Sequence, residues 1–200
     1  GFYLRGLRWR IMLSNSRDGD NVASGLPSAL TCGRYVLLGW FVNSITWFRL
    51  GDAYRAYAFS EDYGRSFSRT MGAILSERVL DVATVFILLV ISSLMLYSSE
   101  DLGRLGIFLG IAFLLMLLSL AGLLAMMQFG MKLARLLPER LKSAYGSFHY
   151  GVMGSFGNLQ LMIMISILIW FTEVGRLFFV TQSLGLSAGV SFSLVLFVTL

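Results

Sequence analysis

Long apolar stretches separated by short polar segments dominate the pattern of this chain. A helix that crosses a bilayer needs about 20 mostly apolar residues. Stretches of that kind predict spans at residues 79–97, 105–127 and 159–181, and a further span from 186–200 onward. The pattern therefore predicts an all-α, polytopic integral membrane helical bundle. We expect residues 1–200 to form one membrane domain, as a fragment of a longer chain.

The first apolar stretch, residues 29–48, is less regular, because it carries Arg34, Asn43 and several hydroxyl residues. Arginines lie on both sides of it, so the bias of Lys and Arg toward cytoplasmic segments places both of its ends in the cytoplasm. Two interpretations stay open. The stretch is either a full span that departs from the charge bias, or a re-entrant helical hairpin with its turn near Gly39.

Composition agrees with a membrane protein. The 200 residues are 56% hydrophobic and only 14% charged, against roughly 45–50% and about 25% in soluble proteins. The net charge is +5, but the basic residues lie between the apolar stretches, mainly in segments 49–78 and 128–158. This placement predicts cytoplasmic segments and does not favour nucleic-acid binding.

Several kinds of chemistry find no support in the sequence. The single Cys32 and the single His149 exclude an intrachain disulfide, a cysteine-rich zinc site and a multi-histidine metal site. No nucleophile–base arrangement and no phosphate-binding glycine loop is visible. We therefore expect no metal, no cofactor and no catalytic residue in this region, and leave open whether the full protein is an enzyme.

Residues 129–145 combine leucines at helical spacing with basic residues. This pattern predicts a helix that lies at the cytoplasmic interface, broken or started by Pro138, and four basic residues near the surface would favour anionic lipid. The alternative is an ordinary helix in a connecting segment that obeys the charge bias.

Glu173 and Arg176 are charged residues inside a predicted span. A charge at a helix centre costs roughly 2.5–3.5 kcal/mol on insertion scales, so such residues usually face the bundle interior and mark a site or pathway. Their spacing of three allows them to pair on one helix face. A structural ion pair, or an Arg176 side chain that reaches toward the outer surface, is the alternative.

Two further clusters lie before the span at 79–97. Glu77 and Asp81 share a helix face, but taken alone they fit the capping of a helix that begins near Ser76. The segment "WFRLGDAYRA", residues 47–56, carries three charged residues, which are Arg49, Asp52 and Arg55. Arginines at a membrane surface suit a phosphate, whereas the alternative is a solvated loop.

In combination these residues resemble the flippase-like membrane domain of lysylphosphatidylglycerol synthases, a family that includes uncharacterised UPF0104-type membrane proteins. The resemblance rests on an early Arg-Trp, an Asn followed by Arg, Gly, Asp and Arg, and a Glu-Arg with Asp three residues on. Here these are Arg8, Trp9, Asn43, Arg49, Gly51, Asp52, Arg55, Glu77, Arg78 and Asp81. The segment "WFTEVGRLFFVTQSLGLS" is similar to a later span of the family, and the usual proline before Arg49 is absent.

The resemblance implies a protein that binds or translocates a charged-headgroup lipid, a phospholipid or lipid-linked glycan, between leaflets. The implied partner is an anionic or aminoacylated membrane lipid, with a homo-oligomer left open, and the implied location is the cytoplasmic membrane of a prokaryote. The expected lipid-binding residues are Arg49, Asp52, Arg55, Glu77, Arg78, Asp81, Glu173 and Arg176. Two alternatives remain: the membrane part of an enzyme that transfers an aminoacyl or sugar group to a lipid, and a non-transporting anchor or scaffold.

Overall fold

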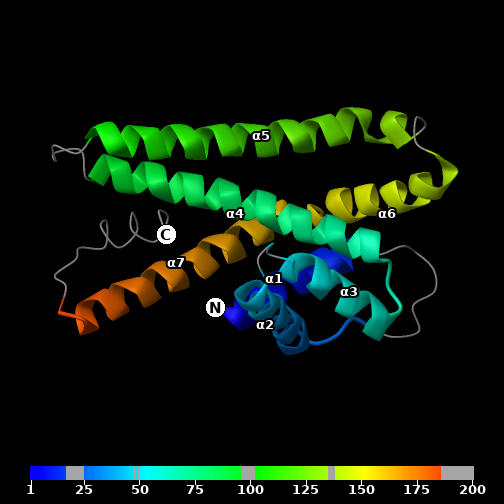
Figure 1. Ribbon diagram of the computed structural model, residues 1–200, viewed down its shortest axis with the longest axis horizontal. Coiled ribbons are helices and arrows are strands. Elements are labelled where there is room, and N and C mark those ends of the chain that lie inside the picture. The colour runs from blue at the N-terminus through cyan, green and yellow to red at the C-terminus, as the bar shows by residue number, and fades with distance from the viewer. Residues whose placement is uncertain (17–24, 47, 49, 96–101, 135–137, 186–200) are drawn as a thin grey trace. The chain divides into compact units, whose positions relative to one another are not determined.

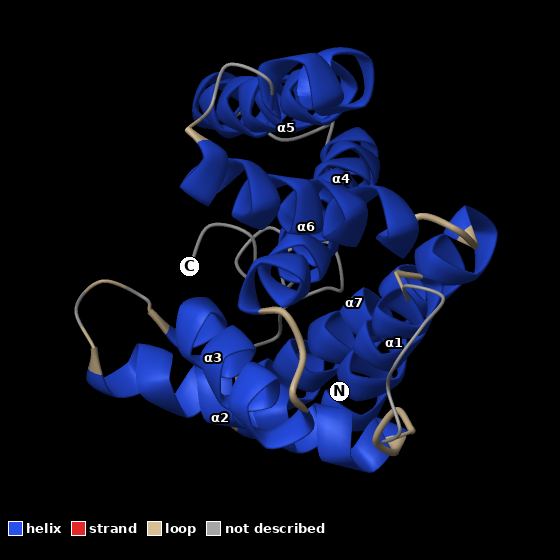
Figure 2. Cartoon of the chain, turned by 90° about the vertical axis from the view of Figure 1, so that its right-hand side faces the viewer, coloured by secondary structure: helices blue, strands red, loops and turns tan. Residues whose placement is uncertain are grey.

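The computed structural model describes residues 1–200 except 17–24, 47, 49, 96–101, 135–137 and 186–200, and the described residues are helical with short connections (Figures 1 and 2). The expected all-α class is confirmed. The helices are α1 (Phe2–Asn15), α2 (Ala29–Ile45), α3 (Gly51–Tyr63), α4 (Phe67–Met95), α5 (Leu102–Ala134), α6 (Glu139–Ser155) and α7 (Leu159–Ser183).

The chain divides into two compact units, and the boundaries fall inside α4, α5 and α7. The first unit comprises Gly1–Arg78 and Leu123–Ile165, and the second comprises Val79–Gly122 and Ser166–Leu200. The first unit therefore contains the whole of α1, α2, α3 and α6. Most of the charged side chains discussed below belong to it.

Glycines allow α1, α2 and α3 to pack with their backbones in close contact. A Cβ atom added to Gly6 on α1 would lie 2.3 Å from the carbonyl oxygen of Ala29 and 2.4 Å from the amide nitrogen of Gly33 on α2. A Cβ added to Gly51 on α3 would lie 1.9 Å from the carbonyl oxygen of Gly39. Small residues at such crossings let membrane helices approach closely, and here they bring three short helices together.

An aromatic cluster fills the space between these helices. The Trp9 ring of α1 lies 4.9 Å from the Phe59 ring of α3, and Tyr35 of α2 meets Phe59 edge to face at 5.6 Å. Trp9 and Phe59 are almost fully buried. The Tyr35 hydroxyl donates a hydrogen bond to the Asp62 carboxylate, which adds a polar link between α2 and α3.

Among the described residues, two helices are long and apolar enough to cross a membrane, at Leu109–Gly130 in α5 and Leu159–Ser183 in α7. No residue in the most apolar part of α5 is buried against the protein, as expected for side chains that face lipid. The predicted stretches 105–127 and 159–181 lie within these two helices. The predicted span 79–97 lies in α4 as far as Met95, and the predicted span 186–200 lies outside the described residues.

Of the two interpretations left open for residues 29–48, the re-entrant hairpin with its turn near Gly39 is wrong, because α2 is one continuous helix through that position. Gly39 serves instead as the contact point for Gly51. The chain reverses after Ile45, and α2 and α3 form an antiparallel helical hairpin in which the Gly51 N–H donates to Asn43 Oδ1 at 2.7 Å. Entry of residues 29–48 into the membrane stays a prediction, and Phe41, Ile45 and Phe48 are exposed along α2 and just after its end.

The predicted helix start at Pro138 is confirmed, because α6 begins at Glu139 with Pro138 as its N-cap residue. The beginning of the segment 129–145 belongs to α5, which continues to Ala134, and the location of the segment at the membrane interface stays a prediction. Proline lacks an N–H donor and has a fixed φ, so it is well suited to a helix start. The alternative of a solvated loop at residues 47–56 is wrong for Gly51 onward, because α3 begins at that residue.

The start of α4 also excludes the capping interpretation of Glu77 and Asp81. The helix begins at Phe67, where the Ser66 hydroxyl accepts a hydrogen bond from the Arg69 N–H at 3.3 Å. Ser76 therefore lies in the third turn of the helix, and its hydroxyl donates to the carbonyl oxygens of Gly72 and Val152. The two carboxylates need another explanation, which their surroundings supply.

We predict that Gly51→Ala separates α2 from α3. The added methyl group meets backbone oxygen and the Asn43 side chain, neither of which can move without breaking the hairpin. Gly146→Ala on α6 is the matched control, because nothing lies within 4 Å of its Cβ position and alanine favours a helix by up to about 1 kcal/mol. Thermal unfolding in detergent should show a lower midpoint for Gly51→Ala only, and equal midpoints would contradict the close contact.

Candidate functional site

A buried carboxylate between two arginines forms the centre of the charged region in the first unit. Glu77 on α4 accepts a hydrogen bond from Arg8 Nη2 of α1 at 3.0 Å through Oε1, and one from Arg55 Nη2 of α3 at 2.8 Å through Oε2. All three side chains are at most 1% exposed. Charges withdrawn from water in this way persist only when they are closely paired.

Tryptophan rings pack against Arg55 and against the neighbouring Arg5 of α1. The Arg55 guanidinium lies 4.8 Å from the centre of the Trp9 ring, and the Arg5 guanidinium lies 5.1 Å from the Trp40 ring. Both distances are within the range of a cation–π interaction. The rings contact the guanidinium groups favourably and introduce no further carboxylate that would compete with Glu77 for Arg55.

The arginines also determine the ionisation of Glu77. Burial by itself would raise the pKa of its carboxyl group, but Arg55, Arg8 and Arg78 outweigh burial and hold the pKa well below the ordinary value of 4.5. Glu77 is therefore ionised at neutral pH. The group of Arg8, Arg55 and Glu77, called the arginine cage below, carries a net charge of +1.

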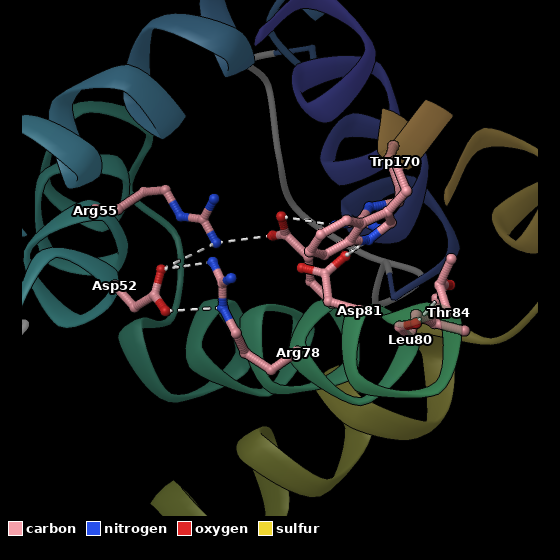
Figure 3. A network of polar contacts seen from close by, with 9 residues as sticks. Asp52, Arg55, Arg78, Leu80, Asp81, Thr84 and Trp170 are labelled. Atoms are coloured by element: carbon pink, nitrogen blue, oxygen red, sulfur yellow. Dashed lines mark hydrogen bonds and ion pairs between the residues drawn. The ribbon is translucent and has the colours of Figure 1, made fainter. Parts of the chain in front are cut away.

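A second ion pair lies at the edge of the cage and reaches solvent. Arg78 donates to both carboxylate oxygens of Asp52, at 2.9 Å from Nε and 3.1 Å from Nη2. Arg55 Nη2 lies 3.6 Å from the same carboxylate (Figure 3). The side chains of Arg78 and Asp52 are 41% and 34% exposed, so this pair, unlike the cage, can exchange partners.

The exposed pair lines an open pocket of about 610 Å³, called the Asp52–Arg78 pocket, whose other lining residues include Trp40, Asn43 and Ser44 of α2. Local structure explains the placement of the carboxylate. Asp52 lies in the first turn of α3, where an acidic group is favoured by the helix dipole, and Asn43 fixes that turn through the Gly51 N–H. The pocket thus combines a cation, an anion, an amide, a hydroxyl and an aromatic ring.

The second unit contains the remaining charged residues of interest. Trp170 on α7 donates its indole N–H to Asp81 Oδ1 on α4 at 3.4 Å, and Asp81 is 7% exposed (Figure 3). Glu173 and Arg176, one turn apart on α7, form an ion pair at 2.7 Å. Glu173 is buried, whereas Arg176 is 60% exposed. The prediction that Glu173 and Arg176 pair on one helix face is confirmed.

The structure brings together four of the predicted site residues in the first unit: Asp52, Arg55, Glu77 and Arg78. Asp81, Glu173 and Arg176 belong to the second unit, and Arg49 lies outside the described residues. Sequence reasoning did not propose Arg8 as a site residue, because the early arginines were counted as a cytoplasmic flank. The spacing of Arg5, Arg8 and Trp9 along one helix was the available signal.

Comparison with known proteins gives a family and one curated relative. The sequence matches the family described as "Lysylphosphatidylglycerol synthase TM region" over residues 1–200. It is 28% identical over 159 residues to "UPF0104 membrane protein MJ1078" of Methanocaldococcus jannaschii, a match that covers 76% of this chain and 65% of that protein. No solved structure matches the chain. The resemblance drawn from the sequence is confirmed.

We predict that Glu77→Gln strongly destabilises the first unit. The substitution removes the charge that compensates Arg8 and Arg55, and leaving buried charges without their partner costs about 3–5 kcal/mol. Unfolding of the purified protein by a denaturing detergent measures the effect. Glu139→Gln, which alters the exposed ion pair with Lys142 on α6, is the control and should change stability little. Equal losses in the two variants would show that the cage does not hold the helices together.

We also predict a pH dependence that belongs to Glu77. Because its folded-state pKa is lowered, its contribution to stability is complete above the unfolded-state value of about 4.5 and decreases as the pH falls below it. The free energy of unfolding of the wild type should approach that of Glu77→Gln between pH 5 and pH 3, by at most about 1.4 kcal/mol per pH unit. A difference between the two proteins that does not change with pH would contradict the lowered pKa.

Proposed function

We propose that this chain, which belongs to the lysylphosphatidylglycerol synthase TM region family, binds the charged headgroup of a membrane lipid in the Asp52–Arg78 pocket and takes part in its transfer between leaflets. The observation that carries the proposal is the solvent-accessible, bidentate pair of Arg78 and Asp52 at the rim of a polar pocket. A pair that is held tightly enough to be oriented, yet remains exposed, is suited to exchange with a ligand.

Arg78 supplies the recognition of phosphate in this proposal. A guanidinium presents its N–H donors in a planar fork that fits carboxylate and phosphate oxygens equally well. A lipid phosphate can therefore replace Asp52 on Arg78 without a change in the geometry of the fork. The Asp52 carboxylate then remains close to Arg55, which lies 3.6 Å away and is fixed by the arginine cage.

The other groups in the pocket favour a headgroup that also donates hydrogen bonds. Asp52 accepts from an ammonium or hydroxyl group once Arg78 has turned to the phosphate, and Asn43 and Ser44 add hydrogen-bonding groups. The pocket thus fits anionic and aminoacylated phospholipids, and the phosphate of a lipid-linked glycan. An anion alone would leave the carboxylate without a role.

Movement of such a headgroup across a bilayer needs polar partners along the path, because unsolvated charge in hydrocarbon is costly. Glu173 and Arg176 lie within α7, a helix able to span a membrane, and their ion pair supplies both signs of charge at that depth. Asp81, bound to Trp170, adds a second acidic group in the same unit. We assign these residues to the translocation path, and place the protein in the cytoplasmic membrane of a prokaryote.

We predict that Arg78→Gln lowers transport of a fluorescent anionic phospholipid by liposomes that contain the full-length protein. Charge-assisted hydrogen bonds contribute about 1.5–3 kcal/mol, so the apparent affinity for the lipid should fall by about tenfold or more. Arg34→Gln, the same chemical change on an exposed part of α2, is the matched control and should leave transport unchanged.

Asp52→Asn provides the complementary test in the same assay. The variant no longer competes with phosphate for Arg78, so an anionic lipid should bind more tightly and an aminoacylated lipid less tightly than in the wild type. Wild-type transport by both Arg78→Gln and Asp52→Asn would reject the pocket as a headgroup site. Absence of transport by the wild type itself would favour an anchor or a lipid-modifying role for the family domain.

A further inference from the structure

A second basic cavity lies in the first unit at the junction of α3 and α4, called the Arg65–Arg69 cavity. It has a volume of about 280 Å³, and its lining includes Arg65, Ser66, Arg69, Thr70 and Ser147. It shares none of its described lining residues with the Asp52–Arg78 pocket. The predicted headgroup residues do not include any of them, so this cavity needs an explanation of its own.

From this cavity we infer a second phosphate-binding site, independent of the proposed headgroup pocket, that takes a phosphomonoester group. Arg65 and Arg69 provide two guanidinium groups, and none of the described lining residues is acidic. Each guanidinium carries five N–H donors, so it can hold a phosphate in addition to contacts within the protein. Ser66 and Ser147 add hydroxyl groups to the lining, whereas the Thr70 hydroxyl donates to the Ser66 carbonyl oxygen at 3.0 Å.

The beginning of α4 adds to the positive field of the cavity. Gly64, Arg65 and Ser66 precede the helix, Arg69 and Thr70 lie in its first turns, and all of them line the cavity. A helix N-terminus attracts anions through its free N–H groups and its dipole. The first turn of α4 contains no acidic residue, whereas α3 and α6 carry Asp52 and Glu139 there. No carboxylate in the first turn of α4 therefore offsets the positive end of its helix dipole.

Packing against α6 fixes the position of these groups. A Cβ added to Gly151 would lie 2.2 Å from the carbonyl oxygen of Arg69, so the two backbones are in direct contact at this point. Ser147 lies one turn before Gly151 on α6. Gly64 has a left-handed backbone, with φ of 60°, that turns the chain sharply between α3 and α4. A site built on two packed helices and a tight turn is organised before its ligand binds.

Size and chemistry limit the ligand to a phosphate and its immediate substituent. Ligand pockets for drug-sized molecules begin at roughly 300 Å³, so this cavity admits a headgroup-sized group and excludes acyl chains. Two guanidinium groups and hydroxyls match the three exposed oxygens of a phosphomonoester ligand better than they match the two oxygens of a carboxylate ligand. The source is either the headgroup of a phosphomonoester lipid in the adjoining leaflet or a soluble phosphate.

The full-length protein in lipid nanodiscs tests this site and separates the two sources. One arm adds inorganic phosphate to protein in phosphatidylcholine nanodiscs and measures binding by equilibrium dialysis with radioactive phosphate. The other arm replaces part of the phosphatidylcholine with phosphatidic acid and measures the shift in thermal unfolding midpoint. Saturable binding in the first arm identifies a soluble ligand, and a stabilisation confined to the second arm identifies a lipid headgroup.

The variant Arg65→Gln/Arg69→Gln should lose at least about tenfold in affinity, or most of the stabilisation by phosphatidic acid, since both charge-assisted contacts are removed. Arg34→Gln, the control for the change in charge, should behave as the wild type. In an Arg78→Gln background, which removes the contribution of the headgroup pocket, the double variant should still abolish the phosphate response that remains. Loss of the response in Arg78→Gln but not in the double variant would overturn the second site and leave the headgroup pocket intact. No response of the wild type in either arm would overturn it as well.

The double variant must be folded for its loss to be meaningful. Its unfolding midpoint without phosphate is therefore measured first, and Arg65→Lys/Arg69→Lys is prepared beside it. Lysine keeps the charge but loses the planar fork, so it should retain part of the phosphate response. If the folded glutamine variant and the lysine variant both respond to phosphate as strongly as the wild type, the cavity does not bind phosphate.

Discussion

The first unit depends on one buried interaction, the placement of the Glu77 carboxylate between Arg8 and Arg55. Removal of charged groups from water carries a large cost, which close pairing and hydrogen bonding can offset. The partners come from α4, α1 and α3, so the offset is available only when all three helices are in register. The interaction therefore specifies one arrangement of helices whose apolar surfaces alone would permit several.

Close backbone packing makes this arrangement possible. The contacts of Gly6 with Gly33 and of Gly39 with Gly51 draw α1 and α3 toward α2, and a side chain at any of these crossings would hold them apart. The Trp9 ring then lies against Arg55 and Phe59 and excludes water from the cage. The glycines allow the helices to approach, the Trp9 ring keeps water from the cage, and the ion pairs of Glu77 join the helices.

Charged groups in the first unit differ sharply in exposure, and this difference distinguishes the enclosed cage from the proposed binding pocket. Arg8, Arg55 and Glu77 are fully enclosed and hold the helices, whereas Asp52 and Arg78 reach solvent at the rim of a pocket. Arg69, nine residues before Arg78 on α4, lies about 14 Å away along the helix axis and faces a different cavity. The helix α4 thereby contributes the Glu77 carboxylate to the arginine cage, the Arg78 cation to the proposed headgroup pocket and the Arg69 cation to the proposed second phosphate site.

Much of the architecture follows from the sequence alone. The apolar stretches at 105–127 and 159–181 predict helices because backbone groups in hydrocarbon must be bonded within the same segment, and α5 and α7 contain both. The order of Asn43, Asp52, Arg55, Glu77 and Arg78 indicated the family, which the comparison confirms. Local patterns of this kind are visible in a sequence because they depend on neighbours along the chain.

Only the tertiary structure decided which charged side chains are buried and which reach solvent. The family motif includes Arg8 and Glu77, but the sequence did not indicate that they pair, because no local pattern marks a contact across 69 positions. Gly39 looked like a turn, although its missing side chain serves a neighbouring helix. The sequence determined the helices and the supply of charges. Packing determined their partners, because the energy of a charge depends on the water and the counter-charges that the fold places around it.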